Sequence, residues 1–329
     1  MKKILHIGTG GTIAAILSDE GYVPGITSKE LLSHVPEIKS MSETDSIQVC
    51  NLDSTNITPE HWIQVADAIR DNYDMYDGFV ITHGTDTMAY TSAGLSYLIQ
   101  NSPKPIVLTG AQQPYGSAQT DVTRNITDAF TYVCNDDSAG VRIVFSGRVI
   151  AGTRARKNYT RSFAAFGSVN FPAVAEVQGS KIIRFIHDNN SGNPVFADGL
   201  NTNVGLVKLA PGLGGEILEY ITEHYDGLVV ESFGTGGLPE YSDYFNLIKK
   251  AADNGKHIVM TTQVPNEGSD LTVYKPGSIV KNSLQVLEAH DMTSETAFAK
   301  LMWILNITSD FNKAKDLFYT NIDHDILYV

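Results

Sequence analysis

Short aliphatic, β-branched runs alternate with helical patterns along most of this 329-residue chain. In the first half, one helix is expected to start at Thr58-Pro59, because a hydroxyl N-cap residue precedes Pro at the first helical position. The other expected elements are strands at residues 3–7, 47–52, 78–82, 105–109 and 141–145, and helices at residues 86–99 and 121–134. This alternation predicts an α/β fold with a mostly parallel sheet and helices on both of its faces.

The same alternation resumes in the second half, after a segment rich in Asn and Gly at residues 187–203. The later expected elements are strands at residues 205–209, 227–231 and 258–261, and helices at residues 215–224, 240–254 and 294–306. We therefore expect two α/β domains: a larger N-terminal domain (1–186) that carries the active site, a linker (187–203) and a smaller C-terminal domain (204–329).

Charge and composition exclude several classes of function. The formal net charge of −13 disfavours binding to nucleic-acid phosphates, so no nucleic-acid partner is expected. Cys50 and Cys134 are expected to be packing residues, and no metal-ligand motif occurs, so neither a metal nor a cofactor is expected. The apolar stretch after Lys3 is too short for a signal peptide, and no run is long enough for a membrane span, which predicts a cytoplasmic protein.

Ligands of open α/β sheets bind at the loops that follow the carboxyl ends of the strands. The first such loop is Gly8-Thr9-Gly10-Gly11-Thr12. A dinucleotide fingerprint would need a third glycine at position 13, where the chain has Ile13. The glycines let the backbone come close to something small and leave Thr12 at the tip, although a tight turn with a capping threonine would use the same residues.

The loop after the second expected strand begins with three polar residues, Asp53, Ser54 and Thr55. Their side chains suit the carboxylate or amide of a ligand, and a simple polar turn is the alternative. The loop after the third strand is His83-Gly84-Thr85-Asp86-Thr87-Met88. Asp86 could be only a helix N-cap, but a threonine beside an aspartate also suits a nucleophile with a charged partner. His83 is expected to be a structural, hydrogen-bonded residue.

A basic cluster occupies residues 154–161 of this acidic chain. Such a run usually forms a solvated face. A lysine held in a cleft near a carboxylate can instead lose its proton more easily and accept one from a threonine hydroxyl. Lys157 is the candidate for that role.

Taken together, these loops resemble the bacterial-type L-asparaginase family. The resemblance covers nearly the whole chain. It is carried by Thr9-Gly10-Gly11-Thr12-Ile13-Ala14 and by the His83–Met88 segment, with Asp53-Ser54-Thr55 between them and Lys157 beyond. The resemblance implies a larger N-terminal and a smaller C-terminal α/β domain. It also implies an active site that a neighbouring subunit often completes, and hence a homodimer or homotetramer.

The resemblance also assigns roles to individual residues. Thr12 is similar to the family's threonine nucleophile, and Tyr22 to the tyrosine of its mobile active-site loop. Thr85, Asp86 and Lys157 resemble a second catalytic group, in which Asp86 also holds the α-amino group of the substrate. Residues 53–55 resemble the segment that holds the α-carboxylate. Which threonine forms the acyl-enzyme stays open; we favour Thr12, with Thr85 and Lys157 relaying protons.

The expected reaction is hydrolysis of L-asparagine to L-aspartate and ammonia, without a cofactor. The segment Ala289-His290-Asp291-Met292-Thr293 resembles the cytoplasmic, type I branch of the family. Glutaminase activity is an alternative, because one methylene is worth only about 1–3 kcal/mol of discrimination. The asparaginase-like subunit of a tRNA-dependent amidotransferase is another, although it carries an extra N-terminal domain for which a first strand at residue 3 leaves no room. A non-catalytic amino-acid sensor on the same fold is a third.

Overall fold

The computed structural model describes residues 1–18, 21–187 and 192–328, and leaves the side chains of residues 17–24 undescribed. The chain divides into two compact units, Met1–Ala197 and Asp198–Val329. The expected linker, residues 187–203, spans this division, and its residues 188–191 lie outside the described part. One piece of it, β14 (Val195–Phe196), pairs with β6 (Ile99–Gln100) of the first unit. The proposed linker bounds stay a prediction.

The first unit is built on an eight-stranded sheet with the order β13-β12-β9-β8-β7-β5-β1-β4. Five neighbouring strands, from β8 to β4 in this order, run parallel, whereas β9, β12 and β13 pair antiparallel. The bounds are β1 Lys2–Gly10, β4 Ser42–Leu52, β5 Gly78–Thr82, β7 Pro105–Thr109, β8 Gly140–Phe145, β9 Arg148–Ala151, β12 Ala175–Gln178 and β13 Lys181–Arg184. The expected mostly parallel sheet is therefore present.

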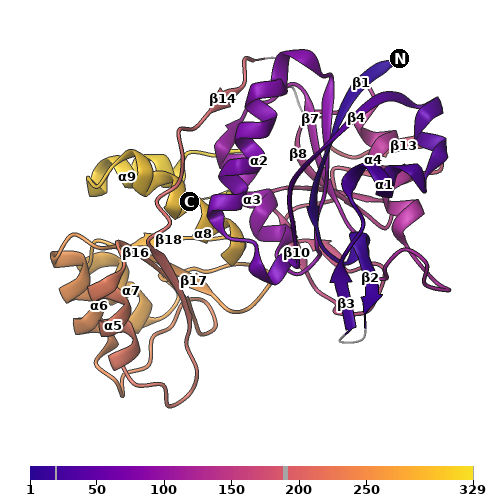
Figure 1. Ribbon diagram of the computed structural model, residues 1–329. Coiled ribbons are helices and arrows are strands. Elements are labelled where there is room, and N and C mark those ends of the chain that lie inside the picture. The colour runs from indigo at the N-terminus through magenta and orange to yellow at the C-terminus, as the bar shows by residue number, and fades with distance from the viewer. Residues whose placement is uncertain (19–20, 188–191, 329) are drawn as a thin grey trace. The chain divides into compact units, whose positions relative to one another are not determined.

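Helices cover both faces of this sheet (Figure 1). On one face lie α1 (Ser28–Ser33), the 3₁₀ helix η2 (Pro36–Ser40) and α4 (Val122–Val133), which share one buried cluster with Ile4 and Val80 of the strands. On the other face lie α2 (Pro59–Asn72) and α3 (Met88–Leu98). Because side chains alternate along a strand, each buried strand supplies apolar residues to both layers.

Short elements connect these layers near the carboxyl ends of the strands. They are the 3₁₀ helices η1 Thr12–Ala14 and η3 Ser54–Asn56, the hairpin β2 Ala15–Ser18 with β3 Gly21–Pro24, and the hairpin β10 Ala155–Lys157 with β11 Phe166–Ser168. A further 3₁₀ helix, η4 Tyr73–Met75, lies instead between α2 and the start of β5. The strands β9 to β13 are only three or four residues long. The alternation of buried and exposed residues cannot be recognised over so few positions, so the sequence did not predict these strands.

Two further elements of the first unit differ from expectation. β4 begins at Ser42, five residues before the expected start at residue 47. It is the edge strand of the sheet, so its first part tolerates polar residues that do not form an apolar run. α3 begins at Met88 with Thr87 as its N-cap residue, so Thr85 and Asp86 precede the helix.

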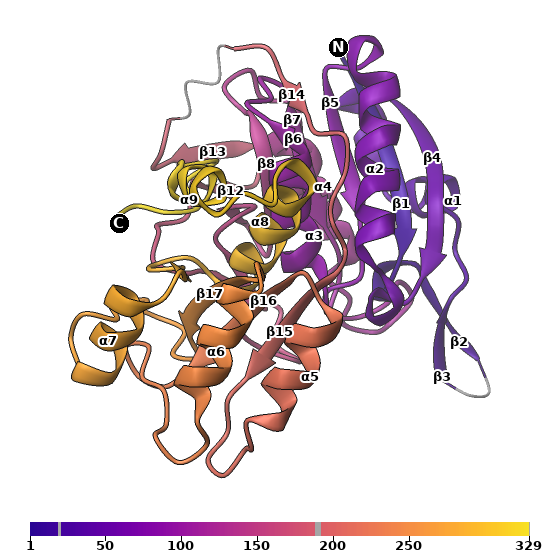
Figure 2. The same ribbon diagram turned by 90° about the vertical axis from the view of Figure 1, so that its left-hand side faces the viewer.

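The second unit contains a parallel four-stranded sheet in the order β15-β16-β17-β18. Its strands are β15 Val204–Lys208, β16 Gly227–Ser232, β17 His257–Thr262 and β18 Leu287–Glu288; its helices are α5 Glu216–His224, α6 Tyr244–Asp253, α7 Lys275–Ser283, α8 Ser294–Ile307 and α9 Phe311–Tyr319. The helices α5, α6 and α7 pack on one face of the sheet, and α8 packs on the other (Figure 2). α7 and α9 were not predicted; α7 opens with Pro276 and Gly277, which obscure a helical pattern.

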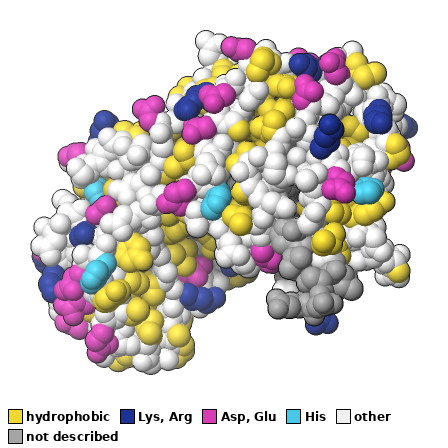
Figure 3. Space-filling view, in the orientation of Figure 1, with side chains coloured by type: hydrophobic (Ala, Val, Ile, Leu, Met, Phe, Trp, Pro, Cys, Tyr) yellow, Lys and Arg dark blue, Asp and Glu magenta, His cyan; other side chains and the backbone are white. Residues whose placement is uncertain are grey.

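The two cysteines, Cys50 and Cys134, are free and partly buried. On the face displayed in Figure 3, Lys and Arg side chains are scattered among Asp and Glu and do not gather into one basic patch. Among the described residues, no helix has the length and apolar character needed to cross a bilayer.

Candidate active site

The loop that follows β1 and the loop that follows β5 touch backbone to backbone. Gly11 has φ +82°, and a Cβ built on it would lie 2.3 Å from both the nitrogen and the Cα of Gly84. A Cβ on Gly84 would in turn lie 2.6 Å from Cβ and Oγ of Ser54. Only glycine fits at this junction, so the glycines of both motifs serve to bring three loops together. The contact places the loop of Thr12 against the loop of Thr85.

Lys157 links the two polar residues of the second loop. Its Nζ donates to Oγ1 of Thr85 at 2.7 Å and to Oδ1 of Asp86 at 2.6 Å, across 72 and 71 residues of sequence. Lys157 is the last residue of β10, at the point where the loop to β11 begins. Its side chain is 16% exposed and that of Asp86 is 56% exposed, so the ammonium is shielded while the carboxylate stays open to a ligand. Of the basic cluster at 154–161, Lys157 therefore does not lie on a solvated face.

Asp86 does not cap the helix, which removes the simplest structural explanation for it. The N-cap residue of α3 is Thr87, and Thr87 Oγ1 donates to the carbonyl oxygen of Ser54 at 2.7 Å. The backbone N–H of Asp86 donates to Oγ of Ser54 at 3.2 Å. Ser54 is thus tied to the second motif through both its side chain and its backbone.

Asp53 and Thr55, the other two members of the segment at residues 53–55, bond to each other. Asp53 is the N-cap residue of η3, and its Oδ1 accepts from both the N–H and the hydroxyl of Thr55 at 2.8 Å. The Asp53 carboxylate is therefore engaged in a local turn. Both residues are exposed, whereas Ser54 is buried at the contact with Gly84.

Thr12 and Tyr22 are placed less fully than the other candidates. Thr12 starts η1 and is half-buried, and its hydroxyl makes no hydrogen bond within the part of the chain that the structure describes. Tyr22 lies in β3, where its backbone pairs with Leu17 in the hairpin that follows η1. The Tyr22 side chain falls outside the described residues.

His83 is a structural residue, as expected. It is buried, its Nδ1 lies 2.6 Å from the carbonyl oxygen of Gly84, and its Nε2 lies 3.0 Å from Oγ1 of Thr91 in α3. Burial lowers the pKa of His83 from 6.5 to about 4, so the neutral ring donates one hydrogen bond and accepts the other. The ring braces the Gly84 peptide immediately before Thr85.

Gln112 is a site residue that the sequence did not indicate. Thr85 Oγ1 donates to Oε1 of Gln112 at 3.1 Å. Gln112 lies on the loop after β7, between this strand and α4. A search of every loop at the carboxyl edge of the sheet would have included it, but no distinctive residue pattern marks that loop.

Comparisons with known proteins agree with this arrangement. Residues 3–189 match the family described as Asparaginase, N-terminal, and residues 203–318 match the Glutaminase/Asparaginase C-terminal domain. An L-asparaginase of Thermococcus kodakarensis is 36% identical over 98% of this chain and 99% of that protein. The chain belongs to the asparaginase family.

The proteins similar to this chain include both L-asparaginases and amidotransferase subunits. A subunit of the glutamyl-tRNA(Gln) amidotransferase of Pyrococcus furiosus is 35% identical over 99% of this chain and 77% of that protein. The solved structure of the T. kodakarensis L-asparaginase superposes with a TM-score of 0.92 at 35% identity, covering 99% of this chain and 100% of the other. A probable cytoplasmic L-asparaginase from Campylobacter jejuni gives a TM-score of 0.85 at 26% identity, with coverage of 98% and 100%.

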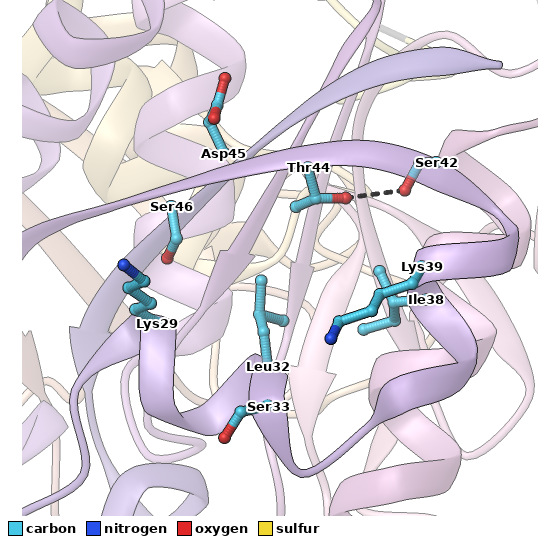
Figure 4. Close-up of a pocket in the computed structure, with 9 residues that line it drawn as sticks. All are labelled: Lys29, Leu32, Ser33, Ile38, Lys39, Ser42, Thr44, Asp45 and Ser46. Atoms are coloured by element: carbon cyan, nitrogen blue, oxygen red, sulfur yellow. Dashed lines mark hydrogen bonds between the residues drawn. The ribbon is translucent and has the colours of Figure 1, made fainter.

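This asparaginase-family chain also has a cavity away from the two threonines. The cavity measures about 450 Å³ and lies between α1, η2 and the edge strand β4 (Figure 4). It is lined by Lys29, Leu32, Ser33, Ile38, Lys39, Ser42, Thr44, Asp45 and Ser46. Ser42 and Thr44 bond to each other at 2.8 Å. None of the residues predicted to bind substrate is among those lining it.

Proposed function

We propose that this protein is an L-asparaginase that hydrolyses L-asparagine to L-aspartate and ammonia through an acyl-enzyme on Thr12. The observation that carries the proposal is the bond from Lys157 to both Thr85 and Asp86, on a loop packed against that of Thr12. Cleavage of a small zwitterionic amide requires two neighbouring hydroxyls, an ammonium and a carboxylate that is open to the substrate.

Asp86 and Ser54 are proposed to hold the amino-acid end of the substrate. The Asp86 carboxylate remains more than half exposed despite its bond to Lys157, so it can pair with the α-ammonium group. The hydroxyl oxygen of Ser54 already accepts the Asp86 N–H, which leaves the Ser54 proton for the α-carboxylate. Asp53 and Thr55 shape this turn, and Thr55 presents an exposed hydroxyl. Fixing both ends of the substrate orients its amide carbon, an effect that can lower a barrier by about 7–11 kcal/mol.

The proposed reaction has two balanced steps. Oγ1 of Thr12 attacks the amide carbon, a C–O bond forms, the C–N bond breaks, and ammonia leaves with the proton that the hydroxyl gave up. Water then attacks the ester carbon, and the Thr12 hydroxyl regains a proton as L-aspartate departs. Lys157 and Thr85 polarise the site and relay protons, and the resemblance to the family adds Tyr22 as a further catalytic residue. The charge of Lys157 offsets the negative charge that develops on the substrate oxygen.

The extent of the similarity supports hydrolysis of free asparagine. The T. kodakarensis L-asparaginase is 36% identical to this chain, and its solved structure superposes with a TM-score of 0.92. A role as an amidotransferase subunit, which would require a protein partner and aminoacyl-tRNA, is the second candidate because several such subunits match 99% of this chain. We further propose a homodimer or homotetramer located in the cytoplasm, and the similarity to a probable cytoplasmic L-asparaginase of C. jejuni supports this location.

Ammonia release is the deciding measurement. The purified protein is incubated with free L-asparagine and, separately, with L-glutamine, alone and together with glutamate-charged tRNA and an amidotransferase partner subunit. The proposal expects ammonia from asparagine without tRNA or a partner. Faster release from glutamine would identify a glutaminase, and release only in the presence of a partner and tRNA would identify the amidotransferase subunit. Binding of either amino acid without ammonia release would identify a sensor.

A further inference from the structure

We propose that Gln112 is a positioning residue that fixes the direction of the Thr85 hydroxyl proton. This inference rests on the proposed function, because it concerns how the same hydroxyl works in amide hydrolysis. Gln112 is partly buried and lies between Thr85 and the hairpin that carries Lys157.

The amide of Gln112 has one possible orientation. Its Nε2 lies 3.4 Å from the carbonyl oxygen of Tyr159 and 3.2 Å from that of Ser162, both in the loop between β10 and β11. Carbonyl oxygens only accept hydrogen bonds, so the NH₂ group must face them. The amide oxygen Oε1 is then turned to Thr85, and it can only accept.

Lys157 sets the other half of the arrangement. An ammonium has three donors and no acceptor, so the Thr85 oxygen accepts from Lys157 and the Thr85 proton must point elsewhere. Oε1 of Gln112 accepts the hydrogen bond that this proton makes. The hydroxyl therefore has a fixed polarity: one lone pair accepts from Lys157, the proton is donated to Gln112, and the second lone pair remains to accept a further hydrogen bond during the reaction.

The loop that carries Gln112 is held in place before any substrate binds. The carboxylate of Asp121 accepts the backbone N–H of Gln112 at 3.0 Å and that of Gln113 at 3.0 Å. Asn125 Nδ2 donates both to Asp121 and to the carbonyl oxygen of Gly110. These bonds anchor the loop on the first turn of α4, so the amide of Gln112 is a fixed reference for the Thr85 hydroxyl.

Gln112→Met tests this role, with Gln113→Met as the matched control. Methionine keeps the length of the side chain but cannot accept the Thr85 proton or donate to the hairpin carbonyls. Gln113 is exposed, and its substitution leaves the backbone bonds to Asp121 in place. We expect Gln112→Met to lower kcat for asparagine about tenfold, as the loss of one orienting hydrogen bond implies. KM and the thermal midpoint should change little, because neither substrate end nor the core is touched.

Two outcomes would overturn the inference: a wild-type kcat in Gln112→Met, or an equal loss of kcat in Gln113→Met. Should Gln112→Met not fold, Gln112→Ala removes the amide without adding bulk and carries the same expectations. Failure of the proposed function is a different result: the unmodified protein would then release no ammonia from asparagine.

Discussion

Gly11 and Gly84, each at the centre of its own loop, pack so closely that neither has room for a Cβ. Gly11 follows the first strand and Gly84 follows the third strand that the sequence predicted. The pair defines the distance between the loops that carry the two threonines. A methyl group on Gly11 must push the Gly84 backbone away, and backbone cannot rotate aside as a side chain can.

Gly11→Ala should therefore both destabilise the protein and reduce asparagine hydrolysis. The positive φ and the backbone contact together should cost about 2 kcal/mol or more in the free energy of unfolding. Gly179→Ala is the control, because Gly179 has φ +62° but no atom within 4 Å of its built Cβ. That variant should lose only about 1 kcal/mol and keep its turnover. Urea unfolding and an ammonia assay of both proteins make the comparison; equal losses would mean that the contact with Gly84 is unimportant.

Removal of either threonine hydroxyl should abolish turnover without unfolding the chain. Thr12→Ala and Thr85→Ala should each reduce kcat for asparagine by more than about 10³-fold. When catalytic groups act as one unit, removal of any one of them removes most of the rate enhancement. Thr85→Val keeps the shape of this buried residue and should be equally inactive. Thr202→Ala, at an exposed position in the second unit, should retain full activity. Near-normal turnover in both Thr12→Ala and Thr85→Ala would show that the site lies elsewhere.

Asp86→Asn should weaken the binding of asparagine. The amide keeps the size of the side chain but removes the charge that pairs with the substrate ammonium. Loss of a charge-assisted hydrogen bond should raise KM about 10- to 100-fold. Steady-state kinetics separate this effect from the second role of Asp86, which is its ion pair with Lys157. A fall in kcat with an unchanged KM would leave Asp86 as a partner of Lys157 only.

Two buried histidines should make stability depend on pH below neutrality. Burial lowers the pKa of His6 from 6.5 to about 3 and that of His83 from 6.5 to about 4. Between pH 6.5 and 4 the unfolded chain binds a proton on each ring and the folded chain does not. The stability that these rings contribute is therefore fully present above about pH 6.5 and is lost as the pH falls. Each histidine then lowers the free energy of unfolding by about 1.4 kcal/mol per pH unit.

His6→Gln isolates one of these contributions. His6 bonds to Ser46 and Thr82 and is not one of the proposed site residues. The difference in unfolding free energy between the unmodified protein and His6→Gln should shrink by about 2 kcal/mol from about pH 7 to about pH 5. Urea titrations of both proteins at both pH values measure this difference. Carboxylates that titrate alike in the two proteins contribute equally to both free energies, so their contributions cancel. A difference that does not vary with pH would contradict a neutral, buried His6.

Local sequence was sufficient to predict two of the central strands of the first sheet. Residues 78–82 and 105–109 are β5 and β7 with the expected bounds, because a continuous run of buried aliphatic residues is a local property of a strand covered on both faces. The start of β4 was missed because an edge strand is not covered in this way. The helix expected at residue 86 begins at Met88, since the Asp86 carboxylate bonds to Lys157 and not to the first turn.

The sequence by itself determined the α/β class, the positions of the main strands along the chain and the segments in which Thr12, Ser54, Thr85 and Lys157 lie. Those properties follow from periodicity and from residue types at strand ends. Only the tertiary structure decided that Lys157 bridges Thr85 and Asp86, that Gln112 accepts a hydrogen bond from Thr85 and that Asp53 accepts one from Thr55. Hydrogen bonds depend on separations of a few tenths of an ångström between atoms far apart in the chain, and no local pattern encodes such distances.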